Sequence, residues 1–179
     1  MGNPFDNAKP RYVVAAEKGD ATAQFSLALR YAHGNDVTQS DEEAVYWYEK
    51  AAEQGHIDAQ FNLTICYQNG KGVTQSYEKV AYWSEKAAEQ GDGDAQYNLG
   101  VCYALGQGVT KSTILASTYY LLSARQGHVH AQKQLFILVK EKVKTVMGAP
   151  EYIEDLQKKG ELLFELTDSL LNIGSVLDT

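Results

Sequence analysis

Two cysteines and a pair of histidines are the side chains in this sequence best suited to covalent or metal chemistry. His128 and His130 are spaced so that both imidazoles could hold one metal ion, and Cys66 or Cys102 could act as a nucleophile or form a disulfide. The sequence has no phosphate-binding loop, no GxSxG, no HExxH and no dinucleotide-binding fingerprint. We therefore predict no enzyme activity, no catalytic residue, no metal site and no cofactor.

The spacing of the cysteines follows from a repeat of 36 residues. Glycines, leucines and tyrosines all recur at this step. They are Gly19, Gly55, Gly91 and Gly127, then Leu27, Leu63, Leu99 and Leu135, then Tyr31, Tyr67 and Tyr103. Chance does not keep so many positions in register, so the chain is built from repeats.

In this register the two cysteines are equivalent residues of adjacent repeats. Equivalent residues of stacked helices lie about 8–10 Å apart, which is too far for a disulfide. Cys66 and Cys102 also fall on the apolar stripe of predicted helices, so we expect free, buried thiols. Both His56 and His128 align with Asp20 and Asp92 at the start of a helix, where helix capping or contact with solvent is the expected role.

Each repeat is predicted to form two helices. In the middle repeat, apolar residues of 57–69 recur at the spacing of one helix face, and a glycine follows directly. A second helix begins after Ser76, a candidate N-cap, and ends at Gly91. In the first repeat, Ser40 and Glu43 are spaced as a capping box. Strand patterns are absent from the sequence.

Two-helix units of this kind cannot bury their apolar faces alone, so neighbouring units must stack. Short loops make the helices antiparallel neighbours. The predicted fold is therefore all-α, a right-handed α-solenoid of antiparallel helix pairs with a tetratricopeptide-like superhelix. We expect one solenoid domain made of a half repeat with a single helix (1–19), three complete repeats (20–55, 56–91 and 92–127), a partial repeat with an extended helix (128–147) and a capping helix (148–179).

The middle repeat resembles the Sel-1-like repeat, a relative of the tetratricopeptide repeat. The resemblance is carried by Ala51-Ala52-Glu53-Gln54-Gly55, Ala59-Gln60-Phe61-Asn62-Leu63, Tyr67-Gln68-Asn69-Gly70-Lys71-Gly72-Val73 and Ala81-Tyr82-Trp83. It extends over about residues 15–135. Asp36 and Thr64 stand where the family pattern prefers glycine.

The resemblance implies a scaffold or adaptor that binds a protein or peptide partner. Hydrolase activity, proposed for cysteine-rich relatives, is the alternative that it implies. Those relatives join two cysteines within each repeat, whereas this chain has a single cysteine in each of two repeats. We therefore favour the scaffold.

The predicted binding surface is the side of each first helix opposite its buried stripe. In tetratricopeptide-like arrays this side lines the concave groove, where peptides or helices bind. We expect aromatic and amide side chains at this surface to contact the partner: Phe25, Phe61, Asn62, Gln68, Asn69, Tyr97 and Asn98. For Phe61 and Ile65, packing against the next repeat is the competing interpretation.

The C-terminal part departs from the repeat. Lys142 stands where a glycine is due, so the helix of the partial repeat should run on until a Gly-Ala-Pro turn breaks it. Residues 150–173 are predicted to form a helix that caps the open end of the array. Leu162, Phe164 and Ile173 exceed what one helix face can bury, which indicates a homodimer contact or a partner helix. Self-association through this helix is thus a further alternative function.

The composition disfavours several classes of partner. The formal charge of −7 argues against non-specific binding to nucleic acid or to an anionic membrane surface. No apolar run reaches the roughly 18 residues of a membrane span, and the first residues have no signal-peptide pattern. Unpaired cysteines also suit a reducing compartment, so we expect a cytoplasmic protein.

Overall fold

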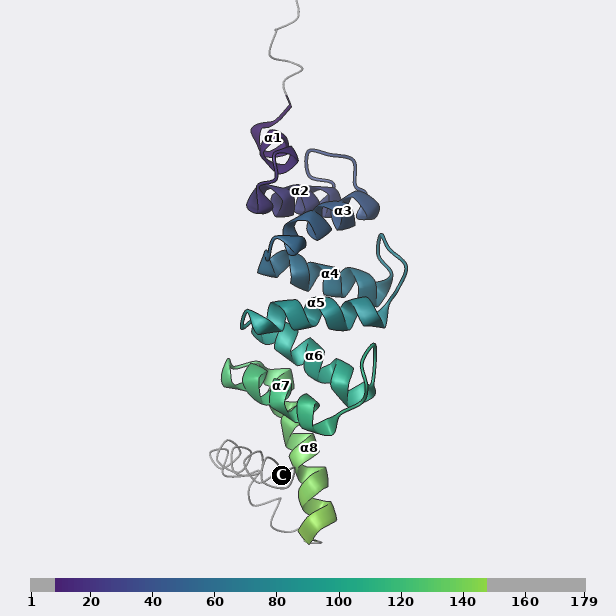
Figure 1. Ribbon diagram of the computed structural model, residues 1–179, viewed down its shortest axis with the longest axis vertical. Helices are drawn as coiled ribbons and strands as arrows, with labels where there is room; N and C mark the ends of the chain where they lie inside the picture. Colours follow the sequence, from purple (N-terminus) through teal and green to yellow (C-terminus); the bar gives the residue numbers. More distant parts are fainter. Residues whose placement is uncertain (1–8, 148–179) are drawn as a thin grey trace, which may run out of the picture.

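The computed structural model describes residues 9–147, with side chains as far as Glu141. Over this range the chain forms eight helices and no strand: α1 (Arg11–Glu17), α2 (Ala21–His33), α3 (Asp41–Glu53), α4 (Ile57–Asn69), α5 (Tyr77–Glu89), α6 (Gly93–Leu105), α7 (Thr113–Arg125) and α8 (Val129–Met147). Figure 1 shows them stacked along the long axis of the molecule, each packed on the next. The predicted all-α solenoid is confirmed. None of these helices combines the length and the apolar character that crossing a bilayer requires.

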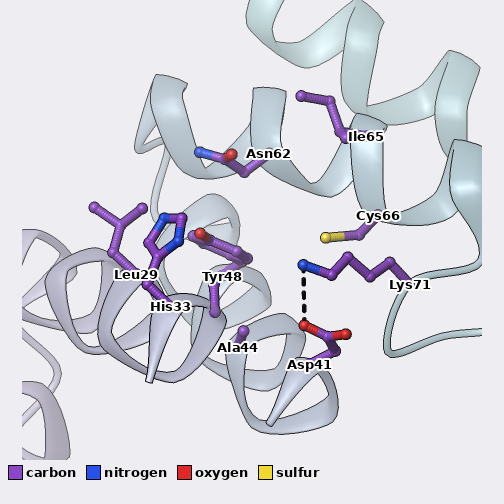
Figure 2. A pocket seen from close by; sticks show the side chains of 10 residues that line it. Leu29, His33, Asp41, Ala44, Tyr48, Asn62, Ile65, Cys66 and Lys71 are labelled. Carbon is purple, nitrogen blue, oxygen red and sulfur yellow. Dashed lines mark ion pairs between the residues drawn. The ribbon is translucent and has the colours of Figure 1, made fainter. Parts of the chain in front are cut away.

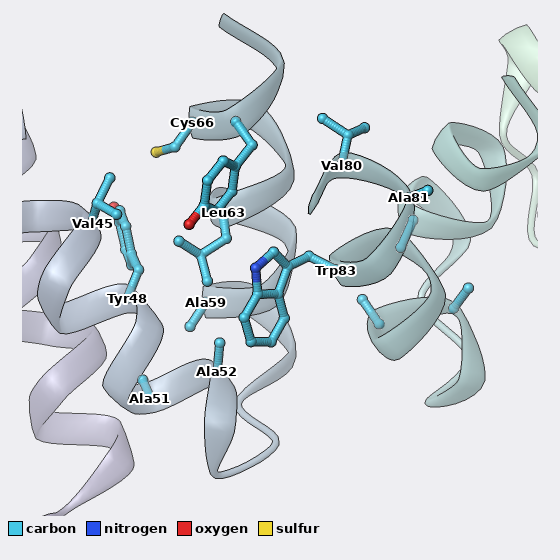
Figure 3. Close-up of a cluster of buried hydrophobic side chains, with 14 of the residues drawn as sticks. Val45, Tyr48, Ala51, Ala52, Ala59, Leu63, Cys66, Val80, Ala81 and Trp83 are labelled. Carbon is cyan, nitrogen blue, oxygen red and sulfur yellow. The ribbon is translucent and has the colours of Figure 1, made fainter. Parts of the chain in front are cut away.

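The three complete repeats are the helix pairs α2–α3, α4–α5 and α6–α7, and each second helix also packs on the first helix of the next repeat. One cluster of buried side chains extends from α2 to α6 (Figure 3), and a second joins α7 and α8, with Tyr103 of α6 packed against both. Leu63 is fully enclosed, and Ala51 and Ala52 of α3 are buried where α3 meets its neighbours. Such small residues let helix backbones approach closely, whereas larger buried rings such as Trp83 fill the wider gaps.

A serine begins each second helix. The hydroxyl of Ser40 accepts a hydrogen bond from the backbone N–H of Glu43 at 3.2 Å, and the equivalent serines cap α5 and α7 in the same way. The capping box predicted here is only half present, because the backbone N–H of Ser40 already donates to the carbonyl of Tyr31 at 3.0 Å. The Ser40 hydroxyl donates to the carboxylate of Glu42 at 3.2 Å.

Buried glutamines tie consecutive helices together. Gln60 is 4% exposed, and its amide nitrogen donates to the carbonyl of Ala52 in the last turn of α3 at 3.1 Å. Its amide oxygen accepts from the amide of Gln90, at the end of α5, at 2.8 Å. The same two bonds recur one repeat earlier and one repeat later. Because carbonyls in the last helical turn lack partners within the helix, these bonds stabilise the buried junction between repeats.

The loop inside a repeat rests on the repeat before it. Gly72 has a φ of +72°, and a Cβ at this position would lie well under 3.0 Å from the backbone oxygen of Asp41 at the start of α3. Gly108 approaches Tyr77 of α5 in the same manner. Glycine thus allows a contact that a larger residue would prevent. Asp36, at the equivalent place in the first repeat, also has a left-handed φ of +60°, and its carboxylate pairs with Arg30.

Residues that face each other inside a repeat complement each other in size. A Cβ on Gly100 of α6 would lie 2.7 Å from the ring of Tyr120 in α7, so glycine makes room for that ring. One repeat earlier the equivalent residues are Thr64 and Ser84, both buried, and the Ser84 hydroxyl donates to that of Thr64 at 3.4 Å. The departure from glycine at Thr64 is therefore accommodated by a small residue opposite.

The two ends of the array differ from the repeats between them. At the N-terminal end of the described residues, α1 is a short helix that packs on α2 without a first helix of its own before it. α8 passes Lys142 and continues as helix to Met147. The predicted capping helix at 150–173, and with it Leu162, Phe164 and Ile173, lies outside the described residues.

Candidate partner-binding groove

The first helices carry an aliphatic residue at one repeated position. We call this set the aliphatic row: Leu29 in α2, Ile65 in α4, Val101 in α6 and Ile137 in α8. Ile65 is 37% exposed, Ile137 is 42% exposed, and the other two are half-buried. Asn62 and Asn98 precede members of the row by three residues, which places them on the same face of their helices. This face therefore offers apolar surface next to amide groups.

A hollow of about 140 Å³ opens at the first two members of the row (Figure 2). Its walls come from α2, α3, α4 and the loop after α4. Leu29, Ile65 and the ring of Tyr48 supply much of the apolar lining, and Asn62 and Lys71 supply polar groups. An apolar cavity of about 150 Å³ can hold a benzene molecule. The hollow is thus large enough for one apolar side chain of a partner.

One ion pair spans two repeats at the edge of this hollow. Lys71 Nζ lies 3.1 Å from Asp41 Oδ1, as the dashed line in Figure 2 marks. Asp41 belongs to the first turn of α3, where the positive end of the helix also favours a carboxylate. Half of the Lys71 side chain is exposed, so the pair adds little stability. The ammonium has three N–H donors, which leaves donors for a bound peptide.

The four predicted amide residues differ in how exposed they are and in whether they line the hollow. Asn62 lines the hollow and is half-buried, although its amide also donates to the carbonyl of Asp58 at 2.8 Å. Gln68 and Asn69 are exposed in the last turn of α4. Asn98 is half-buried at the position equivalent to Asn62.

Two of the three predicted rings have partners in the next repeat. Phe25 stacks on His56 with 4.4 Å between the ring centres, and Tyr97 stacks on His128 with 4.5 Å. These rings support the start of the following first helix. Phe61 is half-buried, and Asp92 occupies the place of the histidine one repeat on. Among the described residues, no ring stacks on Phe61.

The predicted capping role is confirmed for His128 and is wrong for His56, whose side chain makes no capping hydrogen bond to α4. His128 directly precedes α8, and its Nδ1 accepts from the backbone N–H of Ala131 at 3.1 Å. Its Nε2 lies 3.3 Å from a carboxylate oxygen of Asp94. No group of three or more potential metal ligands is close enough to share an ion within residues 9–147.

Both cysteines are free and buried, as predicted. Burial raises the pKa of the Cys66 thiol and raises that of Cys102 to about 11, so both stay protonated at neutral pH. His33 shares the hollow with Cys66, but in the described part of the chain no hydrogen bond joins them, and Tyr48 lies between them in Figure 2. A nucleophilic cysteine needs a nearby base and a lowered pKa. This pair does not provide that arrangement.

Sequence reasoning missed several residues of the hollow. It did not single out Leu29, His33, Asp41 or Lys71 as members of one site. The alignment of Leu29 with Ile65 at the 36-residue step is a signal that could have found the aliphatic row.

The family follows from comparison with known proteins. The Sel1 repeat matches residues 21–56, 57–92 and 93–128. The chain belongs to the Sel1 repeat family. Each matched Sel1 unit begins with the first residue of α2, α4 or α6 and contains one helix pair. No curated protein matches the chain.

Solved structures of Sel1-type proteins share the fold. A Sel1 repeat protein from Oxalobacter formigenes is 40% identical, with 69% of this chain and 93% of that protein covered and a TM-score of 0.65. A protective antigen of uropathogenic Escherichia coli with an SLR fold is 37% identical over 74% of this chain, with a TM-score of 0.69. This chain spans 28% of the antigen's length. Helicobacter pylori cysteine rich protein B is 27% identical, with 67% of this chain and 86% of that protein covered and a TM-score of 0.52.

Proposed function

We propose that this Sel1 repeat chain is a scaffold or adaptor that binds a protein segment along the aliphatic row. Sel1 repeat proteins are generally protein–protein interaction modules. The observation that carries the proposal is the row itself, whose aliphatic side chains stay partly exposed in successive repeats beside a hollow. A bound peptide or helix would insert one apolar side chain between Leu29 and Ile65 and bond through its backbone to Asn62 and Asn98.

The margin of the proposed site is formed by Phe61, Gln68 and Asn69. Phe25 and Tyr97 belong to it through the exposed parts of rings that also support the next repeat. Affinity in such sites comes from a few buried anchors. The free, buried thiols support a cytoplasmic location for this function, because disulfides are rare in that compartment.

A peptide selection tests the proposal. Random peptides displayed on phage are selected against the full chain, and the affinity of the best peptide is then measured by fluorescence titration. Ile65→Glu should weaken binding by about tenfold or more, because it replaces an apolar contact with a charge that binding must desolvate. Tyr82→Glu is the matched control, since Tyr82 is 47% exposed but lies on the second helix α5.

The two variants separate the outcomes. If Ile65→Glu weakens binding and Tyr82→Glu does not, the row is the binding surface. If both variants bind equally well, or if Tyr82→Glu alone loses affinity, the proposed surface is wrong. Circular dichroism of each variant shows that the fold is retained.

A further inference from the structure

The outer side of α7 is aliphatic where the equivalent sides of α3 and α5 are charged. Ile114, Leu115 and Leu122 are 53%, 40% and 38% exposed. We call these three residues the α7 patch. Shifted back by one and two repeats, they align with Glu78, Lys79 and Lys86 in α5 and with Glu42, Glu43 and Lys50 in α3.

The three side chains of the patch are neighbours on one side of the helix. At about 100° per residue, Leu115 and Leu122 lie within about 100° of Ile114. Thr118 lies between them, and its hydroxyl is turned to its own helix, donating to the carbonyl of Ile114 at 3.0 Å. Apolar side chains gathered in this way mark a contact surface, whereas single exposed ones do not.

Another repeat stacked in register would not cover this patch. α5 follows α3 in the array, yet Glu42, Glu43 and Lys50 of α3 remain exposed. Burial of the α7 patch therefore needs a segment that leaves the repeat register. The chain departs from that register at α8, which continues as helix to Met147, past the position where the earlier first helices end.

We propose that residues 150–173 of the same molecule pack on the α7 patch. This segment has more apolar residues than one helix face can hide: Ile153, Leu156, Leu162, Leu163, Phe164, Leu166, Leu170, Leu171 and Ile173. One set of them can cover α8, and the surplus requires a second apolar surface. The patch supplies that surface on the helix against which α8 packs.

The location of the patch supports an occupant from the same chain. Among the second helices α3, α5 and α7, the aliphatic side belongs to the one nearest in sequence to this segment. The segment can also reach it. α8 has 19 residues and is about 28 Å long. As the helix predicted from the sequence, the 24 residues of 150–173 span about 36 Å, so the segment can run back along α8 and reach α7.

Hydrogen exchange of the full chain, followed by mass spectrometry, tests the proposal. The variant I114E/L115K/L122K gives α7 the side chains that α5 carries at the equivalent positions. The control variant E78K/K79E/K86E changes the same three positions on α5. We expect residues 150–173 to be protected in the wild type and in the control. In I114E/L115K/L122K they should exchange roughly a hundredfold faster, because three half-exposed aliphatic contacts are lost.

Three results would overturn the proposal. The first is exchange of residues 150–173 at the rate of a free peptide in the wild type. The second is protection that survives in I114E/L115K/L122K. The third is protection that disappears on dilution as a dimer dissociates in sedimentation, because a second copy would then cover the patch. If I114E/L115K/L122K also loosens α2–α6, the single change Leu122→Lys, measured in the same way, decides the question.

Discussion

Replacing Gly72 by alanine should destabilise the array far more than the same change at Gly91. Both glycines have left-handed φ values, +72° and +90°, so an alanine at either place carries a backbone penalty of about 1–2 kcal/mol. At Gly91 nothing lies within 4 Å of the added Cβ. At Gly72 the Cβ would overlap the backbone oxygen of Asp41, and the loop would have to move away from α3. Overpacking of this kind adds about 1–3 kcal/mol.

Urea unfolding followed by circular dichroism measures this difference. We expect Gly72→Ala to lower the free energy of unfolding by about 2–5 kcal/mol and Gly91→Ala by about 1–2 kcal/mol. Gly108→Ala provides a second test of the same contact in the next repeat, because its Cβ would overlap the backbone oxygen of Tyr77. Equal losses at Gly72 and Gly91 would show that the loop does not rest on the preceding repeat. The reasoning about repeat stacking would then be refuted.

Three further predictions follow from the core. Gly100→Thr should lower the free energy of unfolding by about 1–3 kcal/mol, because the threonine crowds the ring of Tyr120. In a double-mutant cycle with Tyr120→Ser, the loss caused by Gly100→Thr should be smaller, since Thr64 and Ser84 fit together at the equivalent positions. Strictly additive losses would contradict this prediction. Cys66 and Cys102 should react slowly with a thiol reagent until the chain unfolds, and rapid reaction of the native protein would contradict their burial. Burial, with a hydrogen bond to Glu49, raises the pKa of Tyr67 from 10.0 to about 12, so its stabilising contribution is complete below pH 10 and is lost as the pH rises towards 12. Tyr67→Phe should therefore lose less stability over this range in urea titrations, and an unchanged pH profile would contradict the assignment.

Helix positions could be predicted from the sequence because short-range signals set them. The first helix predicted at 57–69 is α4, and Ser76 is the N-cap of α5, since a serine cap and a following glycine act within a few residues. The free state of Cys66 and Cys102 also followed from the repeat step alone.

The site was harder to predict because it depends on residues from different repeats. The hollow needs Leu29 and Ile65 from successive first helices, and its ion pair joins Asp41 to Lys71. Nothing local to Phe25 shows that its ring stacks on His56. The capping box was wrong in part for the same reason, because the Ser40 N–H has a partner in the preceding helix.

Isoleucine-methyl NMR of the full chain, titrated with the phage-selected peptide, tests the proposed function most directly. Ile65 and Ile137 lie on the aliphatic row, Ile114 lies on the α7 patch, and Ile57 packs against the core. The account predicts that the Ile65 signal shifts most, with Ile137 following if the peptide extends along the row, while Ile57 and Ile114 stay in place. A peptide that shifts Ile114 or Ile57 and leaves Ile65 unchanged would contradict binding along the row.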